Sequence, residues 1–330
     1  MEQLALATRG RLAEGEHWGD LAVADTSGRL VVGLGDAERR CYWRSAGKPL
    51  QALGLVTSGA ADAFGLEPCE LAVACASHCA QSLHVDTVRS LLRKAGVHEE
   101  YLRCGTHDPV DDTTRRALLC AGEPARPVHN NCSGKHAGML ATAQHLGAPL
   151  DRYLDLAHPV QQQILTNMEL LTDTPRDEFV IGVDGCGAPT HGLPLRAMAT
   201  AYARFAAGAL PGELGGAAKR LGDAMAACPD HVSGTGSFNS VLLSVAGGSL
   251  VAKGGAEALF CVGHRERGLG LAVKVGDGSG RGLTAVVIRA LTGLKWLDLA
   301  QLRALDAFIQ PPVKNCHGDT VGEVRAVFQL

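Results

Sequence analysis

Short apolar segments alternate with polar turns along most of the chain, and this pattern predicts a mixture of strands and helices. Residues 21–24 and 30–34 are apolar and flank the polar turn 25–29, so we predict an early antiparallel hairpin. Five more apolar segments between turn residues are predicted to be strands. They cover residues 179–183, 250–252, 258–262, 270–275 and 284–287.

Other segments have the apolar spacing of helices. Residues 82–95 place apolar side chains three and four positions apart and end before Gly96, as a helix with a glycine cap does. A helix is also predicted over 136–145, after the turn at Gly134. Another is predicted to begin at Pro49, because proline favours the first helical position.

Two segments bear on domain organisation and sheet content. The small-apolar run 71–76 fits a buried strand or a helix, and we favour the strand. Residues 201–221 are rich in Ala and Gly but keep a helical pattern, which does not indicate a hinge. Because no repeat or low-complexity linker divides the sequence, we expect residues 1–330 to form one α/β domain.

The composition narrows the function classes. The 330 residues are 46% hydrophobic and 4% aromatic, so the chain can bury a large aliphatic core. Its 31 basic and 34 acidic residues nearly balance, which favours a small-molecule ligand over nucleic acid or an anionic membrane. The N-terminus lacks a signal-peptide pattern and no apolar run is long enough to span a bilayer, so we expect a cytoplasmic protein. The eleven cysteines are an odd number, which argues against a disulfide framework, and most are expected to be reduced.

A candidate nucleophile lies before the helix predicted at Pro49. Ser45 and Lys48 are three positions apart, so their side chains share one face of an α or 3₁₀ turn. A serine hydroxyl becomes a good nucleophile when a base removes its proton, and a lysine can be that base once burial lowers its pKa. The same S-x-x-K arrangement serves enzymes that are acylated by β-lactams. Taken alone, the pattern also fits a solvated turn.

The cysteines suggest a second kind of chemistry. Cys132 and Cys186 each lie within two positions of a glycine and a polar residue. They could share a metal ion with Lys135 or His136, in a site that keeps one position open. The alternative is a pair of reduced thiols near the core.

Other polar residues lie in loops beside predicted core elements. Lys253 precedes Gly254 and Gly255, where it could act as a second base or anchor a substrate carboxylate. A surface lysine at a turn is the alternative. Each of the remaining candidates also fits a hydrogen-bonded structural role. They are Ser77, His78, His107, His136 and Asp184.

Seven ordered motifs extend over nearly the whole chain. They are Arg44-Ser45-Ala46-Gly47-Lys48-Pro49, Cys75-Ala76-Ser77-His78, Arg103-Cys104-Gly105 with His107 and Pro109, residues 130–138, residues 158–162, residues 182–190 and residues 253–257. Together they resemble one family, the rhizobial-type (class 3) L-asparaginases. The resemblance implies an α/β (α+β) fold similar to serine β-lactamases, with a central, mainly antiparallel sheet flanked by helices. It also implies a homodimer that hydrolyses L-asparagine to L-aspartate and ammonia.

The resemblance assigns roles to particular residues. It implies two Ser-Lys pairs, Ser45 with Lys48 and Ser77 with Lys253. It implies zinc as the cofactor. The ligands would be Cys132, Lys135 and Cys186, and the residues facing the substrate would be Arg44, His136 and Asp184.

The sequence departs from the family pattern at two places. Cys79-Ala80-Gln81 stands where the family commonly has a serine, a glycine and an acid, and Gly276-Asp277 stands where it usually has two acids. Two other functions stay open. A β-lactamase-like or peptidase-like serine hydrolase would use the same Ser-Lys element, but it would be expected in the periplasm. A non-catalytic, zinc-dependent amino-acid-binding protein would use the cysteines alone.

Overall fold

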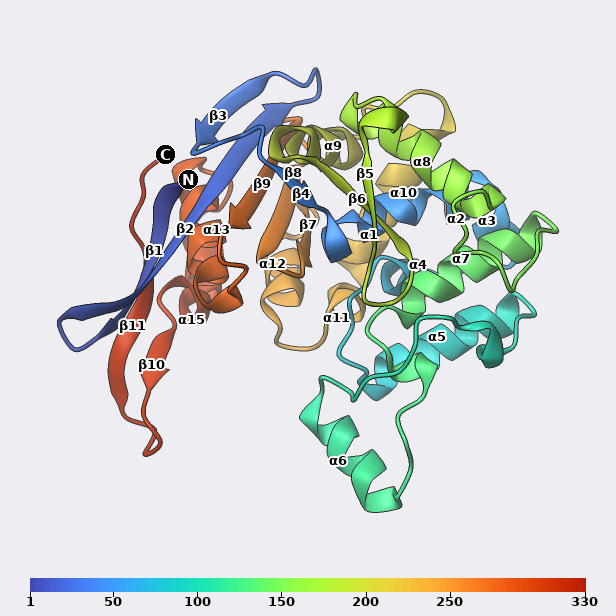
Figure 1. Ribbon diagram of the computed structural model, residues 1–330, viewed down its shortest axis with the longest axis horizontal. Coiled ribbons are helices and arrows are strands. Elements are labelled where there is room, and N and C mark those ends of the chain that lie inside the picture. Colours follow the sequence, from blue (N-terminus) through green and yellow to red (C-terminus); the bar gives the residue numbers. More distant parts are fainter.

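The computed structural model describes residues 1–330, and its largest element is an eight-stranded sheet (Figure 1). The strand order is β10-β11-β1-β2-β9-β8-β7, with β3 also paired to β2, and all neighbours are antiparallel. A smaller antiparallel sheet has the order β4-β6-β5. The strands are β1 (Glu2–Arg9), β2 (Leu12–Asp25), β3 (Leu30–Leu34), β4 (Arg40–Tyr42), β5 (Val180–Val183), β6 (Pro189–Pro194), β7 (Leu250–Gly255), β8 (Leu259–His264), β9 (Leu269–Val275), β10 (Pro312–Lys314) and β11 (Thr320–Ala326).

The helices account for most of the segment between β4 and β7. Figure 1 shows many of them gathered on one side of the large sheet. None combines the length and the apolar character needed to cross a membrane. They are α1 (Lys48–Gln51), α2 (Leu53–Thr57), α3 (Ala60–Ala63), α4 (Pro68–Ala74), α5 (Ser82–Lys94), α6 (Asp112–Ala121), α7 (Ser133–His145), α8 (Pro159–Thr172), α9 (Leu195–Ala207), α10 (Glu213–Ala227), α11 (Pro229–Val232), α12 (Phe238–Ala246), α13 (Leu283–Gly293), α14 (Leu299–Ala304) and α15 (Asp306–Ile309).

Helix α9 packs directly on strands β2, β8 and β9. Two glycines permit this approach, because a Cβ at Gly270 would lie 1.9 Å from the Ala199 carbonyl oxygen and one at Gly263 would lie 2.2 Å from that of Tyr202. Neither position can carry a side chain without moving the helix. The sheet and helix therefore form one closely packed layer pair.

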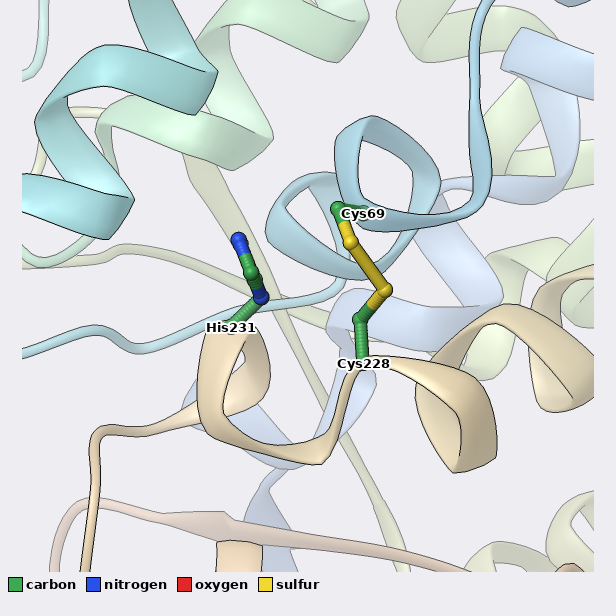
Figure 2. A group of neighbouring side chains, drawn as sticks. All are labelled: Cys69, Cys228 and His231. Atoms are coloured by element: carbon green, nitrogen blue, oxygen red, sulfur yellow. A yellow bond between two sulfur atoms is a disulfide. The ribbon is translucent and has the colours of Figure 1, made fainter.

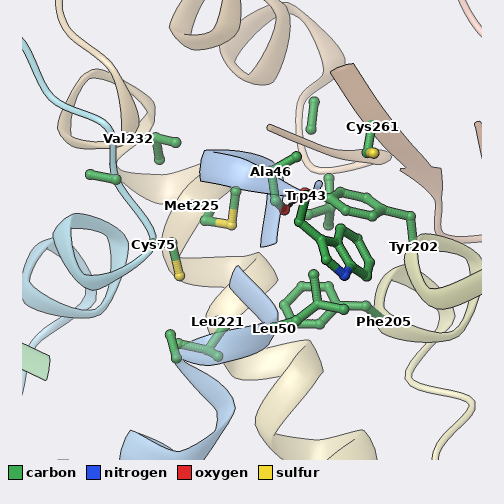
Figure 3. Packing of buried hydrophobic residues seen from close by; sticks show 14 of the residues in the cluster. Trp43, Ala46, Leu50, Cys75, Tyr202, Phe205, Leu221, Met225, Val232 and Cys261 are labelled. Carbon is green, nitrogen blue, oxygen red and sulfur yellow. Dashed lines mark hydrogen bonds between the residues drawn. The ribbon is translucent and has the colours of Figure 1, made fainter. Parts of the chain in front are cut away.

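A continuous core of 84 buried hydrophobic residues joins this layer pair to the other helices. Trp43, Tyr202 and Phe205 lie together in it (Figure 3). The buried Tyr202 hydroxyl donates a hydrogen bond to the Ala46 carbonyl oxygen over 2.7 Å. The core thus holds the turn that carries Ser45.

The structure confirms the mixed α/β class with a mainly antiparallel sheet flanked by helices. The hairpin lies within β2 and β3, and the segments predicted over 179–183, 250–252, 258–262 and 270–275 fall in β5, β7, β8 and β9. The helices predicted over 82–95 and 136–145 are α5 and α7, but α7 begins at Ser133, so Gly134 lies in the helix and the turn predicted there is wrong. The helix predicted from Pro49 begins one residue earlier, at Lys48, and residues 201–221 fall largely in α9 and α10.

Two strand predictions are wrong. Residues 71–76 lie mostly in helix α4, whose first turn contains Pro68 and is closed by a hydrogen bond from the Glu67 amide to the Glu70 carboxylate. Because residues 71–76 are buried all round, their apolar pattern has no period that separates helix from strand. Residues 284–287 lie in helix α13, where burial outweighs the strand preference of Val286 and Val287.

One disulfide was not expected. Cys69 and Cys228, which are 159 residues apart, are bonded to each other, and the other nine cysteines are free. The expectation that most cysteines are reduced is therefore confirmed. The pairing itself depends on the packing of α4 against α10 and α11, which no local pattern reveals.

Candidate active site

The turn with Ser45 lies against strand β7. Residues Arg44–Gly47 form a 3₁₀ helix, which leads directly into α1. A Cβ at Gly255 would lie 2.8 Å from the Trp43 carbonyl oxygen and 3.1 Å from the Ala46 nitrogen. Only glycine allows this contact, which brings the strand that carries Lys253 beside the turn that carries Ser45.

Lys48 is fully buried and is hydrogen-bonded to the segment that follows α4. Its Nζ donates to the Ala76 carbonyl oxygen over 2.7 Å and to Ser77 Oγ over 2.8 Å, and no hydrogen bond joins it to Ser45. The structure therefore pairs Lys48 with Ser77, whereas the motif spacing and the family resemblance pair it with Ser45. Ser45 and Ser77 are both only partly buried.

The second lysine, Lys253, lies on β7 and is also buried. Its Nζ donates to the Gly254 carbonyl oxygen over 2.8 Å and makes no hydrogen bond to Ser77. Burial and the positive charge of Lys48 lower the pKa of Lys253 from 10.5 to about 7. A large fraction of this amine is therefore neutral near pH 7, as a general base requires.

His78 supports the Ser77 segment from behind. Its Nδ1 accepts a hydrogen bond from the Ala80 amide, so the ring proton lies on Nε2, which donates to Ser133 Oγ over 2.8 Å. Burial holds the pKa of His78 well below its usual value, which keeps the ring neutral. Since both ring nitrogens are occupied, His78 has a structural role here.

The three predicted metal ligands come together at the start of α7 and after β5. Cys132, Lys135 and Cys186 are all buried, and Lys135 Nζ donates to Cys186 Sγ over 3.1 Å. A hydrogen bond from Cys186 lowers the pKa of Cys132 against the cost of burial. The positive charges of Lys48 and Lys135 act in the same direction. The cluster thus places the Cys132 thiolate near the amines of Lys48 and Lys135.

This donor set fits zinc. Two thiolates are soft ligands that zinc prefers, and the close approach of Lys135 Nζ to Cys186 Sγ supplies a nitrogen as a third donor. The amine must lose its proton before it can bind a cation. His136, which the residue pattern offered as an alternative to Lys135, is instead hydrogen-bonded through Nδ1 to the Tyr153 hydroxyl.

Arg44 and Asp184 form an ion pair at the same end of the site. Arg44 Nε donates to Asp184 Oδ1 over 2.8 Å, and the Gly185 amide donates to the same oxygen. Burial favours the neutral acid, but the charges of Lys135 and Arg44 and the amide hydrogen bond hold the pKa of Asp184 below its usual value. Arg44 has a φ of 48°, a left-handed conformation that is uncommon outside glycine and is often found at functional sites.

His136 has one unsatisfied nitrogen. The Tyr153 hydroxyl accepts from the Arg103 amide over 2.9 Å, so its own hydrogen is donated to His136 Nδ1 over 2.6 Å. The proton of the neutral ring is therefore on Nε2, which is buried and has no partner. His136 Nε2 is one of thirteen buried polar side-chain atoms without a partner in the protein, and as a donor it can bind an oxygen atom of a ligand. Tyr153 was missed because it is an isolated residue in a loop.

A groove of about 570 Å³ leads to Ser77. Its lining includes Asn131, Asp111 and the glycine-punctuated loop 233–237, none of which the sequence analysis assigned to the site. The two glycines between polar residues in 233–237 were the available signal. His107 does not face a reacting group, since its Nε2 accepts a hydrogen bond from the Asn131 amide over 3.0 Å.

A second cluster lies apart from these motifs. The sulfur atoms of Cys69 and Cys228 and a ring nitrogen of His231 all lie within 4.8 Å of one another (Figure 2). It is the one group of three or more His, Cys, Asp and Glu side chains in the protein with the spacing of metal ligands. The two sulfurs are bonded to each other, so this cluster is a disulfide with a histidine beside it.

A buried lysine hydrogen-bonded to a serine hydroxyl, as Lys48 is to Ser77, is typical of an enzyme that transfers acyl groups. The chain belongs to the L-asparaginase II family, whose model matches residues 5–326, and it is therefore an amidohydrolase of the L-asparaginase type. This match confirms the resemblance seen in the sequence motifs. No curated protein matches the chain.

Solved structures with a detectable likeness are distant. A β-lactamase from Mycobacterium bovis is 14% identical with a TM-score of 0.38, over 79% of this chain and 88% of that one. Mglu in its tris and glutamate form is 17% identical with a TM-score of 0.38, over 87% of this chain and 61% of that one. Mglu in the presence of 4.3 M NaCl is 16% identical with a TM-score of 0.36, over 85% of this chain and 62% of that one.

Proposed function

We propose that the protein hydrolyses L-asparagine to L-aspartate and ammonia through a serine acyl-enzyme that Lys48 helps to form. The observation that carries this proposal is the hydrogen bond between the buried Lys48 Nζ and Ser77 Oγ. Family membership supports the substrate. The site also has a cation, Arg44, and an anion, Asp184, which can bind the α-carboxylate and the α-ammonium group of an amino acid.

In the proposed first half-reaction, Lys48 acts in its neutral form, after it has lost its own proton, and takes the proton of Ser77 as Ser77 Oγ attacks the side-chain amide carbon. The tetrahedral intermediate collapses when Lys48 returns this proton to the leaving nitrogen, so that ammonia departs and an aspartyl ester remains. Water then hydrolyses the ester. Lys253, with a pKa of about 7, is the proposed base for this water.

A second assignment makes Ser45 the nucleophile, as the motif predicts. It is favoured by the backbone at Ser77, whose amide already donates to the Val232 carbonyl oxygen, while the next amide, that of His78, donates to Asn131. Neither amide is free to stabilise an oxyanion on a Ser77 adduct. In this assignment Ser77 passes the proton from Ser45 to Lys48.

The substrate is held by its charged ends in this proposal. Asp184 receives the α-ammonium group and Arg44 the α-carboxylate, so that substrate binding replaces part of the ion pair that they form with each other. The unpaired His136 Nε2–H donates to a substrate oxygen.

The proposed cofactor is one zinc ion per chain, held by Cys132, Lys135 and Cys186. When bound, zinc would supply a positive charge that can polarise a substrate carbonyl, and it would join the start of helix α7, which carries His136, to the loop that carries Asp184. A homodimer and a cytoplasmic location complete the proposal. Sedimentation equilibrium tests the first and cell fractionation the second.

Ammonia release from L-asparagine tests the proposal directly. Turnover is expected with wild-type protein and is expected to be lost in Ser77→Ala. Mass spectrometry of protein quenched during turnover, followed by peptide mapping, locates the acyl group on Ser77 or Ser45. Hydrolysis of a chromogenic β-lactam in place of asparagine would support the β-lactamase alternative. Asparagine binding without turnover would support the binding-protein alternative.

A further inference from the structure

The disulfide and the Ser77 segment belong to the same pair of helices. Cys69 lies in the first turn of α4, and Cys228 stands between α10 and α11 (Figure 2). Helix α4 ends at Ala74 and the chain continues directly through Ala76 to Ser77. Helix α11 ends at Val232, which is buried in the same core as Cys75 (Figure 3).

A hydrogen bond closes the other end of this pair. The Ser77 amide donates to the Val232 carbonyl oxygen over 3.0 Å. Residues 69–77 and 228–232 are thus joined twice, by a covalent bond at one end and by this hydrogen bond at the other. Both acceptors of Lys48, the Ala76 carbonyl and Ser77 Oγ, lie at the hydrogen-bonded end.

Helix α11 needs an external anchor. It has only four residues, which is too short for a helix to be stable by itself. Three links hold it against its neighbours: the disulfide at its start, the hydrogen bond between the Asp230 carbonyl and His84 Nε2, and the Ser77–Val232 hydrogen bond. The disulfide is the one covalent link among them, so without it the Val232 carbonyl is held by hydrogen bonds and packing alone.

Small thiols can approach the disulfide from solvent. A groove of about 490 Å³ runs beside it, and its lining includes Pro68 and Ala227, the residues that precede the two cysteines. Lys219, Arg220 and Asp223 also line this groove; Lys219 pairs with Asp223 and Arg220 pairs with Asp62, so the surface presents both charges. A low-molecular-weight peptide thiol that carries both carboxylate and ammonium groups, of the glutathione class, suits this surface.

We propose that the Cys69–Cys228 disulfide is a redox switch that positions Ser77, with a glutathione-class thiol as its reductant. This inference rests on the proposed function, because the position of Ser77 matters for turnover only if Ser77 acts in the reaction. One thiolate attacks a disulfide sulfur and forms a mixed disulfide, and a second thiolate releases it. Two reagent thiols are oxidised to one reagent disulfide, and Cys69 and Cys228 are reduced to thiols.

The test compares oxidised and reduced wild-type protein. After treatment with reduced glutathione, alkylation and peptide mapping establish the state of Cys69 and Cys228, and circular dichroism establishes that the protein is folded. We expect kcat for L-asparagine to fall at least about tenfold, since a 1 Å displacement of a reacting group can cost about 100-fold. Oxidised glutathione is expected to restore it.

The matched control is the double variant C69S/C228S, which keeps Cys132 and Cys186. It is expected to have the kcat of the reduced protein and no response to either form of glutathione. A response that persists in this variant belongs to other thiols and contradicts the switch. Wild-type protein in which Cys69 and Cys228 are alkylated without reductant, and do not pair with oxidised glutathione, also overturns it.

Amide hydrogen exchange provides a readout that needs no substrate. We expect the amides of residues 75–78 and 229–233 to exchange faster in the reduced protein, because the disulfide no longer holds together the two segments that the Ser77–Val232 hydrogen bond joins. Unchanged exchange in both segments after complete reduction overturns the proposal. If asparagine is not hydrolysed in either redox state, the proposed function fails, and the exchange experiment still decides whether the disulfide positions Ser77.

Discussion

Lys48 Nζ donates a hydrogen bond to Ser77 Oγ over 2.8 Å, across 29 positions in the chain, rather than to Ser45 on its own turn. The amine is fully buried, whereas the hydroxyl it contacts is only partly buried and lines the groove, so Ser77 can be reached by a substrate while its base is shielded from water. The fold therefore links this base directly to Ser77, whereas Ser45 has no hydrogen bond to it. The division of labour between them can be decided by substitution.

Ser77→Ala is expected to lower kcat/KM for L-asparagine at least about 10⁴-fold, because it removes the hydroxyl that Lys48 contacts. Ser45→Ala is expected to lower it less, through substrate placement beside Arg44. Steady-state kinetics on variants shown to be folded by circular dichroism give the comparison. The reverse order, with the larger loss in Ser45→Ala, assigns the nucleophile to Ser45 and makes Ser77 the relay.

In this site, the local geometry was predictable from the sequence, and the contacts between distant segments were not. Ser45 and Lys48 were correctly placed on one short turn, because S-x-x-K spacing and Pro49 determine local geometry. The partner of Lys48 was not predicted, since it depends on where the segment after α4 lies relative to α1. Likewise, the apolar strands of the large sheet were predictable from turn residues. The burial of residues 71–76 on all sides removed the periodicity that would have identified α4 as a helix.

The pH dependence of activity is expected to follow Lys253. Because its pKa is about 7, the amine is protonated below pH 7 and neutral above it, so kcat/KM is expected to rise through pH 7 and then level off. Lys253→Arg keeps the positive charge at all these pH values and is expected to lose about 10²- to 10⁴-fold in rate. A wild-type profile that is flat between pH 6 and 8 would contradict the assignment of Lys253 as a base.

The same lysine gives a stability prediction with a definite sign. Its pKa is 10.5 when unfolded and about 7 when folded, so the unfolded chain binds a proton that the folded protein lacks between these values. The free energy of unfolding should therefore fall as the pH is lowered from about 10.5 to 7, and this contribution should be constant below 7. Lys253→Met removes the contribution. Urea titrations of both proteins between pH 7 and 9.5 measure the difference in slope.

Ala80 marks a departure from the family pattern that carries a conformational cost. It has a φ of 68°, in the left-handed region, at the position where the family commonly has glycine. Ala80→Gly is expected to raise the free energy of unfolding by about 1 kcal/mol. The matched control is Ala117→Gly, on the exposed face of α6, which is expected to lower it by about 0.5–1 kcal/mol. Equal effects in the two variants would show that the backbone at Ala80 is not strained.

Removal of the disulfide is expected to destabilise the fold without abolishing it. It closes a loop of 159 residues, and the bond restricts the unfolded chain. C69S/C228S is expected to lose about 2–4 kcal/mol of unfolding free energy, measured in urea under oxidising conditions. After wild-type protein has been reduced, its free energy of unfolding should equal that of C69S/C228S. A difference that persists in reductant would come from the serines themselves.

The metal prediction depends on an amine that must give up its proton. Lys135 is buried beside Cys186; burial lowers its pKa, but the negative charge of the cysteines, Cys132 first, raises it, so protons and zinc compete for this nitrogen. We expect one zinc per chain by elemental analysis, with affinity that increases with pH. Lys135→Met removes the nitrogen donor and the competing proton together. It is expected to bind zinc more weakly and with a smaller dependence on pH, while Cys316→Ser, at an exposed free cysteine, is expected to bind as wild type does. Zinc binding that is unchanged in Lys135→Met would restrict the site to the two cysteines and another donor.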